Sequence, residues 1–428
     1  MLTAIVLVFV LAYAAIALEH PLNVNKSASA LLGAGLLWTL YAVATGDATK
    51  VSHDLNESLM GTAQIVFFLM GAMTIVEVVD AHNGFEVITS RIRTAKLASL
   101  VWMIGFVTFF LSAILDNLTT TIVMVSLMKK LLAKREDRLF FAGIIVIAAN
   151  AGGAWTPIGD VTTTMLWIGG QITAVEIMKG VFLASIVSLL VPLAVTAKVL
   201  GNRPVEAPPR MDESMLPDTT AFERNLMFYL GLGVLVAVPV FKSITHLPPF
   251  MGILFGLGLL WMVGDLVHRK QEDDLKKQRL TMARALTRID MSSIVFFIGI
   301  LLCVAVLEHT HILSSLAKWL DQTVGRQDII VLIIGLVSAV VDNVPLVAAS
   351  MGMYSLADFP PDSFLWEFMA YCAGTGGSIL IIGSAAGVAA MGLEKIDFVW
   401  YVKKISGLAL LGYFAGAAVY VVQYNLFH

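Results

Sequence analysis

The stretch "SAILDNLTTT" (residues 112–121) and the stretch "SAVVDNVPLV" (residues 338–347) each place an Asp-Asn pair inside a long apolar segment. The same Ser-Ala dipeptide begins four residues before each Asp. A carboxylate in the middle of a bilayer costs about 2.5–3.5 kcal/mol on insertion scales, so such residues are rare and usually functional. The repeated motif therefore suggests that one polar site is built from two related halves.

The composition is that of a polytopic membrane protein. Of 428 residues, 58% are hydrophobic and only 14% are charged, which is more apolar surface than a soluble chain can bury. The net charge of −3 gives no support to a nucleic-acid partner, and we expect none. Cys303 and Cys372 lie in apolar segments, so a disulfide framework is not expected. Residues 1–20 lack a basic start and an A-x-A cleavage site, which favours a retained first span over a cleaved signal peptide.

Hydropathy predicts ten candidate spans. A spanning helix needs about 20 apolar residues. The candidates are 2–18, 28–45, 60–80, 139–170, 180–199, 225–242, 248–267, 291–308, 363–393 and 405–426. Two of them, 139–170 and 363–393, are too long and too rich in glycine for one plain helix, so we expect each to be a broken span. The basic loop 270–288 should be cytoplasmic by the positive-inside rule, which places both termini outside.

The two segments that hold the Asp-Asn pairs are predicted to be re-entrant hairpins. The 13 residues of 329–341 make about 20 Å of helix, less than the ~30 Å hydrocarbon core. Hairpin 329–357 would have its tip at Asp342-Asn343, and hairpin 97–128 would have its tip at Asp116-Asn117. The first hairpin is less sharply defined, because its first arm, 97–115, has 19 residues.

The sequence that follows each hairpin repeats as well. "NAGGAWTPIGD" (150–160) aligns with "GTGGSILIIGS" (374–384), which matches three glycines in each. We therefore predict an all-α polytopic membrane protein with two inverted repeats of about five spans. They are residues 1–200 and 223–428, joined by a cytoplasmic linker at 201–222. Inverted repeats with interrupted helices are the architecture of many secondary transporters. An interruption leaves backbone N–H and C=O groups unpaired, which lipid cannot satisfy but a cavity or a bound ion can.

Acidic, amide and hydroxyl side chains gather in these four segments. The candidate Na⁺/H⁺ site residues are Asp116, Asn117, Thr119, Asn150, Thr156, Asp160, Asp342, Asn343, Thr375 and Ser378. Oxygen ligands suit a hard cation. Neither hairpin and neither broken span contains Lys or Arg, so we expect a positive cargo. The alternative is that the acids are structural and that some hydroxyls only cap helices. Asp160 aligns with Ser384, so the two halves are not expected to be equivalent.

Four ordered motifs carry a family resemblance. "ILDNLTTT" (114–121), "NAGGAWTPIGDVTTTMLW" (150–167), "VDNVPLVAA" (341–349) and "GTGGSILIIGSAAG" (374–387) together resemble the NhaD-type sodium/proton antiporters of the ion transporter superfamily. The resemblance implies exchange of Na⁺ and Li⁺ for H⁺ in a bacterial inner membrane. It also implies a homodimer whose hairpin-bearing domain moves as an elevator against a scaffold. Dicarboxylate transporters of the superfamily carry Ser-Asn-Thr at the tips, whereas both tips here begin with Asp.

Two function classes remain open at this point. A cation/proton antiporter is the main hypothesis, with Asp116 or Asp342 expected to exchange a proton for Na⁺. An arsenite, oxyanion or dicarboxylate permease is the alternative. No P-loop motif supports ATP-driven transport. No nucleophile–base motif indicates an enzyme, and no cofactor is expected besides the transported ions.

Overall fold

The computed structural model describes residues 2–90, 94–206, 219–269, 280–340 and 342–427. Its regular secondary structure is helical, and seven described helices are long and apolar enough to cross a membrane. They are α3 (Lys26–Thr45), α4 (Ala48–Ala81), α10 (Ala174–Leu200), α11 (Ala221–Thr245), α12 (Pro249–His268), α14 (Met291–His309) and the run Phe398–Phe427. That run consists of α20 (Phe398–Tyr401), the π-helical turn η3 (Val402–Ser406) and α21 (Gly407–Phe427). A shorter apolar helix, α1 (Leu2–Ala17), precedes them. Residues 207–218 of the linker and 270–279 of the basic loop lie outside the described residues.

Each segment with an Asp-Asn pair forms two short helices. The first gives α6 (Leu97–Ser112) and α7 (Asn117–Leu131), and the second gives α16 (Gln327–Val337) and α17 (Asn343–Met353). Even the 16-residue α6 is only about 24 Å long, short of a ~30 Å hydrocarbon core. The chain that leaves α10 touches both ends of the first pair: Leu97 N donates to Arg203 O (2.9 Å) and Ala133 N donates to Glu206 O (2.8 Å). Both ends of this hairpin therefore lie on the same side.

Each glycine-rich segment is interrupted near its middle. It yields α8 (Arg135–Gly153) and α9 (Val161–Gly169) in the first half, and α18 (Phe364–Gly376) and α19 (Ala385–Glu394) in the second. A Cβ on Gly152 would collide with the backbone carbonyl of Phe109, and a Cβ on Gly376 would collide with that of Gly335. The aligned glycines thus allow each interrupted helix to approach the first arm of its hairpin closely.

The repeated Ser-Ala dipeptides have the same role in the two halves. Ser112 Oγ donates to the carbonyl oxygen of Ala149 at 2.6 Å, and Ser338 Oγ donates to that of Ala373 at 3.0 Å. All four residues are buried. Each serine therefore ties the end of the first hairpin arm to the interrupted helix beside it.

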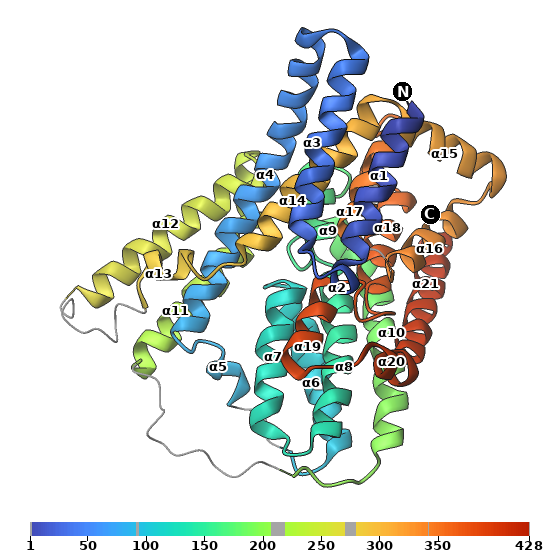
Figure 1. Ribbon diagram of the computed structural model, residues 1–428. Coiled ribbons are helices and arrows are strands. Elements are labelled where there is room, and N and C mark those ends of the chain that lie inside the picture. The colour runs from blue at the N-terminus through green and yellow to red at the C-terminus, as the bar shows by residue number, and fades with distance from the viewer. Residues whose placement is uncertain (1, 91–93, 207–218, 270–279, 341, 428) are drawn as a thin grey trace.

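The packing partners of the helices are also duplicated. α6 packs on α8 as α16 packs on α18, and α7 packs on α19 as α17 packs on α9. α1 pairs with α3 as α11 pairs with α12. In Figure 1 the first hairpin occupies the lower half of the molecule and the second occupies the upper half. The unwound segments between α8 and α9 and between α18 and α19 lie between these halves and frame the site.

The helices differ from the predicted spans mainly at α4. This helix begins at Ala48 instead of near residue 60 and has 34 residues, about 51 Å of helix. Its first turns are polar and are capped by Asp47, which accepts from Thr49 N and Lys50 N. Hydropathy detects only the apolar part, whereas the helix continues past it, and α3 and α4 project beyond the top of the bundle in Figure 1. The connecting helices are α2 (Glu19–Leu22), α5 (Glu86–Thr89), α13 (Met282–Leu286) and α15 (Ile312–Thr323).

Candidate functional site

Four helices begin at the centre of the molecule, and each has a capped N-terminus. The caps are Asp116 on α7, Asp160 on α9, Asp342 on α17 and Ser384 on α19. Their side chains accept from the backbone N–H groups of Thr119 (2.8 Å), Thr162 (3.0 Å), Val344 (3.2 Å) and Gly387 (3.2 Å). Asp and Ser are preferred caps, so capping alone accounts for these residue types. A further role must rest on the contacts of the remaining oxygens.

Asp160 connects the two hairpin tips. While Oδ1 caps α9, Oδ2 accepts from Asn117 Nδ2 at 2.7 Å and from Asn343 Nδ2 at 3.5 Å. The Asp160 residue is only 1% exposed, and each asparagine is 3% exposed. One buried carboxylate oxygen therefore receives an amide from each of the two tips.

Asn150 of α8 extends this network into the second interrupted helix. Its Oδ1 accepts from Asn117 Nδ2 at 3.0 Å. Its Nδ2 donates to Ser378 Oγ at 3.0 Å and to Ser384 Oγ at 2.9 Å. We call the connected set the central network; its members are Asn117, Asn150, Asp160, Asn343, Ser378 and Ser384, all of which are buried.

Five of the predicted site residues lie outside the central network. Thr119 Oγ1 donates to Asp116 Oδ2 at 2.7 Å, so these two side chains bond each other at the start of α7. Thr156 Oγ1 donates to Ala113 O at 2.7 Å, and Thr375 Oγ1 donates to Tyr371 O at 2.6 Å. The fifth residue is Asp342. The hydrogen bonds of the three threonines and of Asp116 thus stabilise hairpin and helix ends, and the contacts between the halves centre on Asp160.

Sequence reasoning missed a basic side chain at the second tip. Lys26, the first residue of α3, places Nζ 3.0 Å from Asp342 Oδ2. Neither hairpin contains Lys or Arg, but the fold brings Lys26 from α3 to Asp342. The two residues are 316 positions apart, and no local pattern links them. Among the described residues, no ion pair involves Asp116 or Asp160.

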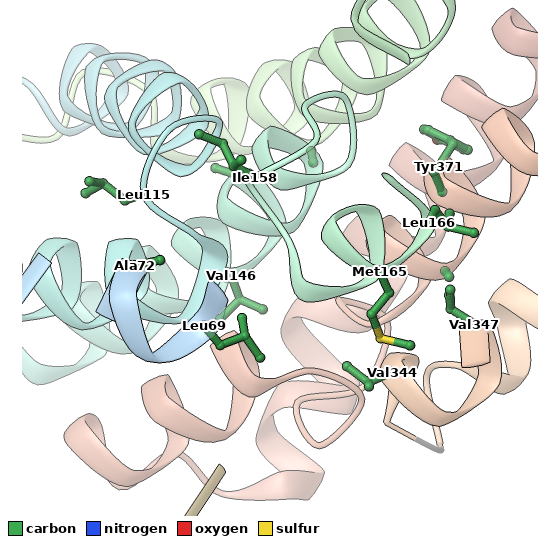
Figure 2. Packing of buried hydrophobic residues seen from close by; sticks show 14 of the residues in the cluster. Leu69, Ala72, Leu115, Val146, Ile158, Met165, Leu166, Val344, Val347 and Tyr371 are labelled. Atoms are coloured by element: carbon green, nitrogen blue, oxygen red, sulfur yellow. The ribbon is translucent and has the colours of Figure 1, made fainter. Parts of the chain in front are cut away.

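Apolar side chains enclose the polar centre. Met165 and Leu166 of α9 are buried beside α17, which contributes Val344 and Val347, and Figure 2 shows Met165 close to Val344. Met165 and Leu166 lie in the second turn of α9 after its cap Asp160, and Val344 and Val347 lie in the first two turns of α17 after its cap Asp342. Because such surroundings lower the local dielectric, a charge on Asp160 interacts more strongly with an ion there than it would in water.

A bundle of membrane spans in which interrupted helices meet at buried polar side chains defines a secondary transporter. The family model described as CitMHS, citrate transporter, matches residues 9–374. Sodium/proton antiporter 1 of Arabidopsis thaliana is 52% identical over 426 residues, which is 99% of this chain and 73% of that protein. The Na⁺/H⁺ antiporter NhaD of Vibrio cholerae is 30% identical over 451 residues, covering 98% and 91% respectively. The chain belongs to the citrate transporter family, within its NhaD-type sodium/proton antiporters.

A solved structure gives the same fold. The crystal structure of the YdaH transporter of Alcanivorax borkumensis matches with a TM-score of 0.59 over 89% of this chain and 90% of that chain. The two sequences are only 12% identical, so this match bears on the fold alone.

Proposed function

We propose that this protein exchanges Na⁺, and also Li⁺, for H⁺ across a membrane, with Asp160 as the carboxylate at which cation and proton compete. The observation that carries the proposal is the contact of one buried carboxylate oxygen with amides from both hairpin tips. The named relatives, sodium/proton antiporters of a plant and a bacterium, support the same function. The activity is transport, with no catalytic step and no cofactor.

The side chains of the central network can serve both the ion-free and the ion-bound state. In the structure, the amide N–H groups of Asn117 and Asn343 point at the carboxylate of Asp160. An amide also has an oxygen acceptor, and rotation of its last side-chain bond exchanges the two groups. A Na⁺ beside Asp160 would thus find amide and hydroxyl oxygens, the ligands that hard cations prefer. A proton on the same carboxylate would exclude the cation, and this exclusion couples the two fluxes.

We propose that the duplicated halves form an inverted repeat, 1–200 and 223–428, joined by the cytoplasmic linker. The equivalent contacts of Ser112 and Ser338 support the duplication, and the positions of the hairpins in opposite halves support the inversion. The hairpins and interrupted helices would move as an elevator against a scaffold of α1, α3, α4, α11, α12 and α14 in a homodimer, with both termini outside. Relatives come from a plant as well as bacteria, so the similarity does not single out a bacterial inner membrane.

The family description, citrate transporter, favours a second candidate, an anion permease. An anion site needs positive charge that is free to meet the cargo, from a basic side chain or from uncapped helix N-termini, and the four N-termini at this site are already capped. Among the described residues, Lys26 is the basic side chain that reaches a tip, and it is already paired with Asp342. The central network supplies a carboxylate instead, which would repel an anion. The geometry therefore favours the cation exchanger.

Transport by everted vesicles tests the proposal directly. A pH gradient is imposed and followed with a fluorescent dye while Na⁺, Li⁺, K⁺ or citrate is added. We expect Na⁺ and Li⁺ to collapse the gradient in vesicles with the wild-type protein and to have little effect with Asp160→Asn. Accumulation of labelled citrate that does not require Asp160 would instead establish the anion permease.

A further inference from the structure

The ion pair at the second tip joins the scaffold to the hairpin. Lys26 Nζ, at the start of α3, lies 3.0 Å from Asp342 Oδ2 and 4.4 Å from the centre of the Phe296 ring on α14. The Lys26 and Asp342 side chains are 22% and 15% exposed. The ammonium group is therefore held between a carboxylate and an aromatic face, both of which favour a cation at that point.

At the first tip, no described basic side chain forms an ion pair with Asp116. Both carboxylate oxygens of Asp116 accept hydrogen bonds from Thr119 of the same helix. The counterpart of α3 among the helices of the second repeat is α12, because α12 pairs with α11 as α3 pairs with α1. Helix α12 is capped by Pro248, and its first residue is Pro249. Pro248, Pro249 and Phe250 are not basic, whereas the first residue of α3 is Lys26. The two tips thus share the Asp-Asn sequence, but within the part of the chain that the structure describes, Asp342 has a basic partner and Asp116 has none.

We propose that Lys26 is a tethered cation that takes, at Asp342, the place of a second Na⁺, so that the wild-type protein binds a single Na⁺, at Asp160. This inference rests on the proposed function and specifies how many Na⁺ ions each chain binds. A charged carboxylate near the centre of a membrane is costly unless it takes up a proton or pairs with a side chain or a dissolved cation. Lys26 is part of the chain and neutralises Asp342 through the ion pair, so no Na⁺ is needed at Asp342.

Other groups near this pair would remain if Lys26 were shortened. Asp290 caps α14, and Glu19 of α2 accepts from the backbone N–H of Lys26 at 3.2 Å. The buried hydroxyl of Tyr13 on α1 has no hydrogen-bond partner among the described residues. The vacated position would thus keep carboxylate and hydroxyl oxygens, which suit Na⁺.

The experiment is equilibrium binding of ²²Na⁺ to the purified full-length protein, together with the Na⁺ dependence of exchange in proteoliposomes. Wild type should bind a single Na⁺ per chain with a hyperbolic dependence. Lys26→Met should bind a second Na⁺, and its exchange should depend on Na⁺ sigmoidally. Lys26→Arg keeps the charge and should restore single, hyperbolic binding.

Lys242 supplies a matched control, because its Nζ also lies over an aromatic ring but forms no ion pair with any described acid. It donates to the carbonyl oxygen of Trp167 at 2.8 Å and lies 4.5 Å from the centre of that ring. Lys242→Met should keep single Na⁺ binding. If folded Lys26→Met binds a single Na⁺ hyperbolically, as wild type does, the tethered-cation inference is overturned.

A double variant keeps the test decisive if Lys26→Met does not fold. Lys26→Met with Asp342→Asn removes both charges and should fold, bind a single Na⁺ and show a hyperbolic dependence. Loss of all Na⁺ binding in the folded double variant would contradict the inference. Failure of wild type itself to bind Na⁺ would contradict the proposed function, a result distinct from either outcome above.

Discussion

Replacement of Asp160 by Asn separates a structural cap from a cation ligand. The amide keeps an oxygen for the N–H of Thr162, so α9 stays capped and the protein should fold. The negative charge facing Asn117 and Asn343 is lost. Hydrogen bonds to charged groups are worth about 1.5–3 kcal/mol, and every 1.4 kcal/mol is tenfold in affinity. If the charge strengthens Na⁺ binding by a similar amount, apparent Na⁺ affinity should fall about 10- to 100-fold.

The aligned cap in the other half gives the matched control. Ser384 Oγ accepts from Asn150 Nδ2 at 2.9 Å and from Gly387 N at 3.2 Å, and both are neutral bonds. Such a bond is worth about 0.5–1.5 kcal/mol, so Ser384→Ala should reduce affinity by no more than about tenfold. Both variants are compared by Na⁺-induced collapse of a pH gradient in proteoliposomes. Equal effects, or less than about a threefold change with Asp160→Asn, would mean that Asp160 only caps α9.

Two further outcomes follow from the duplicated halves. Gly152→Ala and Gly376→Ala should each destabilise the protein by about 1–3 kcal/mol, because the new methyl group meets a backbone carbonyl. Gly35→Ala, where nothing lies within 4 Å, is the control and should not. Thermal unfolding in detergent compares the three variants, and tolerance of both of the first two changes would contradict the close packing. Cysteines at Lys130 and Asp358, in a background without the two native cysteines, should react with an impermeant reagent from opposite sides of the membrane; labelling from one side would exclude the inverted repeat.

Much of the architecture could be predicted because it depends on local composition. Apolar runs located the spans, the short arms suggested hairpins, and glycines marked the unwound segments 154–160 and 377–384. These features are set by bilayer thickness and by backbone hydrogen bonding, which act on contiguous residues. The extra length of α4 was missed because its first turns are polar.

The site was harder to predict because its contacts join distant residues. A threonine inside a helix often bonds its own backbone, as Thr375 does with Tyr371, and the sequence does not distinguish this from a ligand. The sequence does not distinguish Asp160 from the acids Asp116 and Asp342. The fold does so, because Asn117 and Asn343 both donate to Asp160 Oδ2. Lys26 had no sequence signal, since it lies in α3 and outside every motif.

The central claim is that Na⁺ displaces a proton from Asp160. Calorimetric titration of Na⁺ into the purified protein, in buffers with different ionisation enthalpies, counts the protons released for each Na⁺ bound. Because the two ions compete, apparent Na⁺ affinity should rise with pH and level off once the site is deprotonated, and proton release should decline over the same range. Wild type should release protons at low pH, and Asp160→Asn should release none. Equal proton release by both would contradict the account.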